Sequence, residues 1–445
     1  MTWKNRIQDS FEKNTKECFS SLAVGEELTI SLGGEHSDFV RFNRSRVRQA
    51  TSVEQAQVTL SLQTATKLNK VAFPMTGDPQ EDRRRFLFQL GRARQELTSL
   101  PDNPYPQALA ETGVSHQDQE APFPQAAFMM EQVSSELQND DFVGYLAAGP
   151  IFRAIKNSKG TSHWYSQDLF FVDYSLYDET RAVSTNVAGQ AWAEESWKNS
   201  LQDSRRFLER MKRPVREISK GDYRVYLAPG AIYDLLGTTS WGGFSYRDLK
   251  LGVNGLRKLF EGDKTLSPLV TLVENFELHV HPRFNALGEM APLHTPLIKA
   301  GQPGQLLVNT RTASEYGVPA NGAGEHESPR SLELKPGQIS RDQILSKLGT
   351  GLYISNLHYL NWSDHQTARI TGMTRYACFW VENGEMVSPI RDVRFDVSLY
   401  DILGANLLGL TDFQETLVNN LTYSSRGLGG QRVPGLLIDG FRFTL

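Results

Sequence analysis

An Asn-Gly pair set between two strand-like runs is the feature that most constrains this chain. Asn383-Gly384 follows the apolar run Cys378-Phe379-Trp380-Val381 and is flanked by Glu382 and Glu385. A two-residue Asn-Gly turn between strands is the strongest short-range signal for a β-hairpin, because both positions need positive φ. Upstream, residues 352–355 and 368–373 alternate apolar and polar side chains, which is typical of strands with one buried face. We therefore predict an antiparallel meander across residues 351–389 as the spine of the C-terminal half.

Length, charge and cysteine content set wider limits. The 445 residues are enough for two or three domains, and the net charge of −4 demands neither a nucleic-acid partner nor an acidic substrate. Two cysteines, Cys18 and Cys378, cannot make a disulfide framework or a cysteine-only metal cluster. The charged N-terminus lacks the apolar region of a signal peptide, and no apolar run approaches the roughly 20 residues that span a bilayer. We expect a soluble, cytoplasmic protein without a membrane partner.

The N-terminal half mixes strand-like and helix-like segments, which predicts an α+β fold with an antiparallel sheet. Asp78-Pro79 is a typical helix start, and the arginines of that helix share it with an apolar stripe, so we interpret them as its solvated face and not as a nucleic-acid site. The predicted helices span residues 4–22, 78–97, 124–137 and 192–211, and the predicted strands span 28–32, 38–42, 46–51, 57–62, 67–73, 142–148, 151–156 and 163–174, with a turn at Gly33-Gly34.

A break at Lys212-Arg213-Pro214 marks the predicted domain boundary, because proline ends a helix. Residues 1–213 would form the N-terminal α+β domain and residues 214–445 a β-rich C-terminal domain. Within the latter, residues 317–328 are rich in glycine and polar residues, which predicts an exposed or mobile loop that a protease would cut first.

Several segments resemble the TldD/PmbA family, once called modulators of DNA gyrase. RPVREISKGDYRVYLAPGAIYDLLG, residues 213–237, matches the family's entry into its C-terminal domain almost position by position. GLYISNL, ITGMTR and FWVENGEMVSPI resemble its C-terminal signature, and FVRFNRSRVRQAT resembles its first sheet. The resemblance covers nearly the whole chain and is closest to the PmbA, or TldE, branch. It implies the two-domain α+β fold described above.

The catalytic members of this family are zinc peptidases with an HExxxH motif, and the resemblance places that motif on residues that differ. Anchored on Leu235-Leu236, the two histidines would fall at Gly237 and Gly242 and the glutamate at Thr238. The cysteine ligand expected ahead of a "GQ.VP" run would fall at Arg426, whose guanidinium offers only hydrogen-bond donors. The resemblance therefore implies a chain without catalytic residues or a metal of its own, with zinc held by a TldD-like partner.

One other constellation of polar residues is a candidate site. If residues 276–281 form a strand, Glu277, His279 and His281 share one face, and His294 follows thirteen residues later. Histidines at i and i+2 can hold a metal if a third ligand converges. The competing interpretation, which we favour, is a polar strand face at an inter-domain groove or a dimer contact.

The family resemblance and the candidate histidines together leave three possible functions. The first is a non-catalytic TldE-like subunit that pairs with a TldD-like metallopeptidase, or with itself as a homodimer, to process or degrade unfolded peptides such as microcin precursors and antitoxins. The second is an autonomous metal-dependent hydrolase that uses His279, His281 and His294. The third is a regulatory protein that binds DNA or DNA gyrase, as the older family name suggests, which the mild negative charge disfavours. We expect the first.

Overall fold

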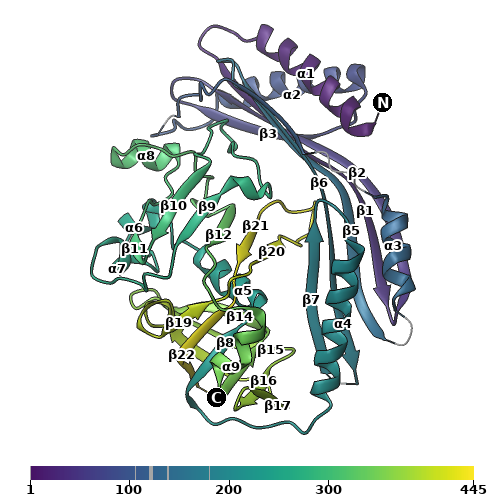
Figure 1. Ribbon diagram of the computed structural model, residues 1–445. Coiled ribbons are helices and arrows are strands. Elements are labelled where there is room, and N and C mark those ends of the chain that lie inside the picture. Colours follow the sequence, from purple (N-terminus) through teal and green to yellow (C-terminus); the bar gives the residue numbers. More distant parts are fainter. Residues whose placement is uncertain (1, 106, 120–123, 138–139, 180, 445) are drawn as a thin grey trace.

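The computed structural model describes residues 2–105, 107–119, 124–137, 140–179 and 181–444. The first half is built on one seven-stranded sheet with the order β3-β2-β1-β5-β6-β4, in which β7 also pairs with β6 (Figure 1). Only β4 runs parallel to its neighbour among the described strands of this sheet. The strands are β1 (Glu27–Asn43), β2 (Arg46–Gln63), β3 (Leu68–Met75), β4 (Val114–Gln119), β5 (Asp141–Asn157), β6 (Ser162–Asp178) and β7 (Arg181–Gly189).

Four helices cover one face of this sheet, and the sequence sets which face. Even-numbered residues of β1 such as Leu28 and Ile30 are apolar and pack under the helices, whereas the odd-numbered Glu35 and Ser37 point to the opposite face. That opposite face packs against the C-terminal half through apolar contacts such as Phe171 with Val280. The helices are α1 (Trp3–Ser20), α2 (Pro79–Leu97), α3 (Ala126–Ser135) and α4 (Glu194–Met211).

The predicted helices of this half are confirmed, but the predicted strand breaks are wrong. Gly33-Gly34 is not a turn, since both residues lie inside β1 and pair with β2. A Cβ at Gly34 would lie 2.3 Å from a ring carbon of Phe152, so glycine here makes room for an aromatic ring on β5. β2 and β5 likewise run through their predicted gaps, and the sequence analysis missed β4 and β7.

The C-terminal half holds two sheets where the sequence predicted one. A six-stranded sheet has the order β11-β10-β9-β12-β21-β20, and a nine-stranded sheet has the order β14-β15-β18-β22-β8-β13-β16-β17, with β19 also on β22. Each contains one parallel pair among antiparallel ones, β12 with β21 and β13 with β8. The first sheet comprises β9 (Leu272–Asn275), β10 (His294–Lys299), β11 (Gln302–Pro303), β12 (Ser331–Leu334), β20 (Glu415–Val418) and β21 (Gly430–Val433). The second comprises β8 (Gly221–Leu227), β13 (Gly351–Ile354), β14 (Asn356–Asp364), β15 (Arg369–Arg375), β16 (Phe379–Glu382), β17 (Glu385–Pro389), β18 (Arg394–Ser398), β19 (Leu407–Leu410) and β22 (Leu436–Phe443).

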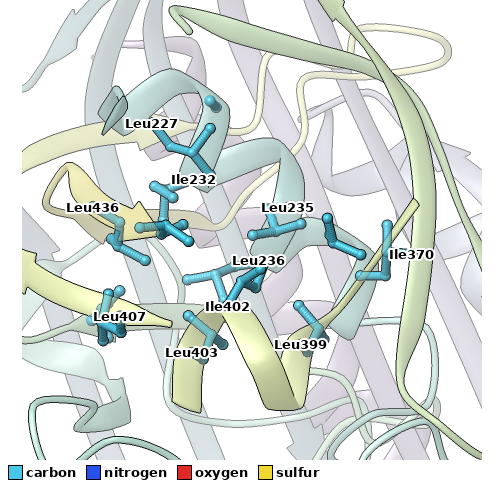
Figure 2. Close-up of a cluster of buried hydrophobic side chains, with 14 of the residues drawn as sticks. Leu227, Ile232, Leu235, Leu236, Ile370, Leu399, Ile402, Leu403, Leu407 and Leu436 are labelled. Atoms are coloured by element: carbon cyan, nitrogen blue, oxygen red, sulfur yellow. The ribbon is translucent and has the colours of Figure 1, made fainter. Parts of the chain in front are cut away.

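The helix α5 (Pro229–Thr239) is the centre of the largest apolar core. Its Leu235 and Leu236 are almost fully buried and meet side chains that come from β15, from β22 and from residues 399–407 (Figure 2). The proline at its first turn suits a helix start, where no backbone N–H is needed. The shorter helices are α6 (Tyr246–Lys250), α7 (Arg257–Phe260), α8 (Thr310–Tyr316) and α9 (Ile344–Leu348).

The Asn-Gly hairpin is confirmed, but the meander around it is wrong. Asn383 and Gly384 have φ values of 52° and 79° and join β16 to β17, as a two-residue turn requires. The strands β14 and β15, however, lie on the other side of the sheet, separated from β13 by β18, β22 and β8. The reason is that β13 pairs in parallel with β8, which occupies the edge that the meander would have needed for β14.

Replacing Gly384 by Ala tests the role of this turn. A Cβ at φ 79° is strained, and we expect the substitution to destabilise the chain by about 1–2 kcal/mol. Chemical denaturation measures the change, with Glu385→Ala at the exposed neighbouring position as the control. An unchanged midpoint for Gly384→Ala would contradict this view of the turn.

The segment 317–328 is a loop with several exposed residues, as its composition predicts, but buried contacts also hold it in place. Glu327 is only 1% exposed, and its carboxylate accepts hydrogen bonds from Ser245 Oγ at 2.6 Å and from the backbone N–H of Asn309 at 2.9 Å. Gly322 and Ala323 are also buried. A buried, hydrogen-bonded carboxylate fixes this segment to the body, so it is a poor choice for the first protease cut.

None of the helices in the described part of the chain combines the length and apolar composition of a membrane-spanning helix. The observed architecture is α+β, as predicted. The division into residues 1–213 and 214–445 stays a prediction.

Candidate functional site

Two of the residues at the expected zinc-motif positions lie in the last turn of α5. Thr238 is buried, and its hydroxyl donates to the carbonyl of Asp234 at 3.3 Å. Gly237 faces Gln431 of β21, because a Cβ built on it would lie 3.8 Å from the Gln431 amide nitrogen. Burial raises the pKa of Asp234 to about 7. This end of α5 therefore faces the strand that follows the glycine-rich segment.

Gly242 lies beyond the helix. The helix α5 ends at Thr239, and the N–H of Gly243 donates to the Thr239 carbonyl at 2.9 Å to close a tight turn. Gly242 has a φ of 88°, and an added Cβ would come within 2.5 Å of Asp248 Oδ2. A side chain at this position could not lie one helical turn from position 237 on the same face.

Arg426 is one of the most buried polar side chains, at 1% exposure. It lies in the loop between β20 and β21, which reaches across to the N-terminal sheet (Figure 1). Its guanidinium donates to the carbonyls of Leu169 at 2.6 Å and Gly149 at 3.0 Å, and its backbone N–H donates to the carboxylate of Glu35 at 3.2 Å. Burial lowers the pKa of Arg426 to about 10, while Glu35 favours its charged form. Arg426 thus connects this loop to β1, β5 and β6.

The strand predicted over residues 276–281 does not form. β9 ends at Asn275, and residues 276–278 form one turn of 3-10 helix, followed by His279 with a φ of 53°. The cause is Asn275, whose side-chain carbonyl accepts from the N–H of Glu277 at 2.9 Å and turns the backbone out of the strand. Glu277, His279 and His281 therefore do not share one strand face.

The candidate histidines turn to three different partners. His279 Nδ1 lies 3.2 Å from the Gln117 amide nitrogen, and His281 Nδ1 lies 2.8 Å from the carbonyl of Pro282. His294 Nε2 lies 3.1 Å from the carboxylate of Glu277, at a half-exposed site. Across the residues that the structure describes, no three His, Cys, Asp or Glu side chains gather as metal ligands would. The structure does not bring His279, His281 and His294 together.

A cavity of about 620 Å³ lies where the polar face of the N-terminal sheet meets the C-terminal half. Arg153 of β5 projects from the sheet, while His281 and Arg330 project from the opposite wall. The remaining lining residues come from β1, β2, β3 and β5, from the segments 282–286 and 324–325, and from Ser424 and Ser425 beside Arg426. We call this space the junction cavity.

Histidine 281 provides a pH test of this region. Burial, and to a lesser extent the nearby Arg330 guanidinium, lowers the pKa of His281 to about 3, whereas a histidine in the unfolded chain has a pKa of about 6.5. Between these values the unfolded chain binds more protons, so stability falls as the pH drops from about 6.5 towards about 3. In urea titrations at several pH values, His281→Asn should show a shallower loss than the parent chain over this window. Identical slopes would contradict the burial of a neutral imidazole.

Comparisons with known proteins identify the family. Residues 220–445, just over half of the chain, match the profile of the PmbA/TldA metallopeptidase C-terminal domain. The chain belongs to the PmbA/TldD family. Among curated proteins, none is significantly similar in sequence.

Solved structures of PmbA/TldD-type proteins share the fold over the whole chain. TldE from Thermococcus kodakarensis is 13% identical with a TM-score of 0.75, and the match covers 99% of each chain. A proposed modulator of DNA gyrase from Bacteroides thetaiotaomicron is 14% identical with a TM-score of 0.76, covering 99% of this chain and 98% of the other. Another from Thermotoga maritima is 15% identical with a TM-score of 0.72 and full coverage of both. At such identities the likeness concerns the fold alone.

The residues at the positions where the resemblance places the family's zinc ligands do not fit a zinc ion. Zinc is held by thiolate, imidazole or carboxylate groups, whereas Gly237 and Gly242 carry no side chain and Arg426 is a buried cation whose donors already reach backbone carbonyls. The turn at Gly242 also departs from the helix that an HExxxH motif needs.

The sequence analysis missed the junction cavity. One signal was present, since Arg153 lies between Ile151 and Ile155 on one face of β5, where a charged residue is unexpected. The opposite wall gave no such signal, because it depends on how residues 282–286 and 324–330 fold back onto the sheet.

Proposed function

We propose that this chain is a TldE-like subunit that does no zinc chemistry of its own and works with a TldD-like metallopeptidase partner on unfolded peptides. The proposal is supported by the presence of Gly237, Gly242 and Arg426 at the positions where the resemblance places the family's ligands. Without those ligands the chain has no Lewis acid to polarise a peptide carbonyl and no metal-bound water to attack it. The partner supplies both, and this chain contributes binding surface.

The scaffold suits peptide binding. Among the described strands of the N-terminal sheet, β3, β4 and β7 each pair with one strand only, and an extended peptide can pair with such an edge through backbone hydrogen bonds. β4, with the sequence VSHQDQ, has a polar, half-exposed surface that leaves recognition to the backbone and tolerates varied side chains. This supports a role in capturing peptides of varied sequence.

The two alternatives have less support. A hydrolase that uses His279, His281 and His294 would need them to converge on one metal, and each has a different partner. For a nucleic-acid or gyrase regulator, the arginines of α2 are the basic candidates. Each of them pairs with a carboxylate: Arg83 with Glu17, Arg84 and Arg85 with Glu81, Arg92 with Glu96, and Arg94 with Glu26.

Metal content and assembly test the proposal. The chain purified alone should hold much less than one zinc per chain by elemental analysis, because its ligand positions carry no suitable donors. When it is expressed with a TldD-like chain from the same organism, the two should elute together and the zinc should follow the partner. One tightly held zinc in the isolated chain, or separate elution of the two chains, would refute the proposed role.

A further inference from the structure

The junction cavity contains a half-buried cation, Arg153, that has few hydrogen-bond partners. The Arg153 side chain lies flat over Gly33, where an added Cβ would be 3.5 Å from the guanidinium carbon. Its Nη1 donates to the carbonyl of Phe152 at 2.8 Å, and more weakly to that of Gly34 at 3.5 Å. No carboxylate within the described ranges forms an ion pair with it. A half-buried guanidinium that forms no ion pair and has only the longer-range attraction of Glu35 is incompletely compensated, so such a site favours a counter-ion.

Arg330 contributes an unused donor from the opposite wall. Its side chain is 10% exposed, its Nε lies 3.3 Å from Glu274, and its Nη2 donates to the carbonyl of Gly322 at 2.9 Å. Its Nη1 is buried and has no hydrogen-bond acceptor among the described residues. Buried donors without acceptors are rare and indicate that a ligand or solvent group completes the site.

The carboxylates around the cavity are already engaged or screened by water, so the arginines of the cavity can still bind one more negative charge. The negative charge of Glu35 favours the charged forms of both Arg153 and Arg426. Its oxygens already accept hydrogen bonds from Ser37, Gln55 and the Arg426 backbone N–H. Glu274 is used by Arg330. Glu289 lies near Arg330, but burial raises its pKa and it bonds to Thr310 and Asn285. Glu325 lines the cavity from an exposed position, where water screens its charge.

We propose that the junction cavity binds a carboxylate of a peptide, held between the guanidinium groups of Arg153 and Arg330. Both guanidinium groups line the same cavity, and charge-assisted hydrogen bonds between such groups and a carboxylate are the strong ones. The choice of a peptide rests on the proposed function. The volume of about 620 Å³ accommodates several residues of an extended chain. The carboxylate belongs either to the peptide's C-terminus or to an acidic side chain.

Binding to the isolated full chain tests this site. Fluorescence anisotropy would compare a labelled Ala-Gly-Ser hexapeptide in three forms: a free C-terminal carboxylate, a C-terminal amide, and an amide with one internal glutamate. We expect at least one acidic form to bind about tenfold or more tightly than the neutral amide. Preference for the free acid identifies a C-terminal carboxylate, and preference for the internal glutamate identifies a side chain. Equal affinity for all three would overturn the proposal, as would binding of inorganic phosphate with no discrimination among the peptides.

Variants link the effect to the cavity. Arg153→Gln and Arg330→Gln should each reduce the preference for the acidic peptide by about tenfold, whereas Arg391→Gln, at a position 72% exposed and outside the cavity, should not. Unchanged preference in both cavity variants would refute the site.

Ser425 offers a test that leaves the arginines in place. It is exposed and lines the cavity, so Ser425→Glu should fold and supply a competing carboxylate. Ser425→Glu should abolish the preference for the acidic peptide and Ser425→Gln should preserve it. The reverse result would refute the site. Because this assay needs no partner, its failure leaves the proposed function standing if partnered cleavage still occurs.

Discussion

Replacing Arg426 by methionine should be among the most damaging single substitutions in this chain. The change removes the donors that reach the carbonyls of Leu169 and Gly149 and takes from buried Glu35 one of its two nearby positive charges, leaving only Arg153. Removing one partner from a buried charged arrangement typically costs about 3–5 kcal/mol. We expect a loss of this size in urea denaturation, together with loosening of the loop between β20 and β21.

Three companion variants make this result specific. Arg432→Ala, at an exposed position a few residues away, should change stability by less than about 0.5 kcal/mol. Arg426→Lys should recover part of the stability, since an ammonium keeps the charge but not the planar fork. Arg426→Cys restores the family's expected ligand, yet it should bind no zinc because Gly237 and Gly242 remain. Wild-type stability in Arg426→Met would show that Arg426 does not connect the two halves.

Local signals predicted much of the fold because they depend on a few neighbouring residues. Asp78-Pro79 begins a helix and Asn383-Gly384 makes a hairpin wherever they occur, and both were predicted. The partners of the strands were not predicted, because alternation of apolar and polar residues indicates a strand but not the strand with which it pairs. β13 shows this, since its parallel pairing with β8 joins residues more than a hundred positions apart. The turn predicted at Gly33-Gly34 was wrong for a similar reason, because the need for glycine at position 34 comes from the ring of Phe152 on a distant strand.

The candidate site was predictable only in part. The resemblance to the family indicated Gly237, Thr238, Gly242 and Arg426 as the zinc-motif positions. In the structure, Gly237 and Thr238 lie at the end of α5, Gly242 lies in a tight turn, and buried Arg426 connects its loop to the N-terminal sheet. The prediction that Glu277, His279 and His281 share a strand face was wrong because the Asn275 side chain turns the backbone out of the strand. The alternation of polar residues in the sequence does not reveal such a turn. The junction cavity depends on segments that are distant in sequence, and Arg153 alone hinted at it.

The second large effect concerns peptide cleavage. If the family's ligand positions are Gly237, Gly242 and Arg426, as proposed, the isolated chain should leave unfolded peptides intact. Adding a TldD-like partner should change the rate from background to readily measurable cleavage, since the partner's metal supplies the nucleophile. A chelator should abolish that cleavage, and added zinc should restore it.

The most direct test of the proposed function is to measure how fast an unfolded peptide is cleaved by the isolated chain, by the isolated partner and by the mixture of the two. We expect the isolated chain to be inactive, and the mixture to exceed the partner alone and to lose its activity with a chelator. A partner variant without its HExxxH histidines should be inactive in the mixture, whereas Gly237→Ala in this chain should change little. Metal-dependent cleavage by the isolated chain, or activity of the mixture with the inactivated partner, would contradict the central claim.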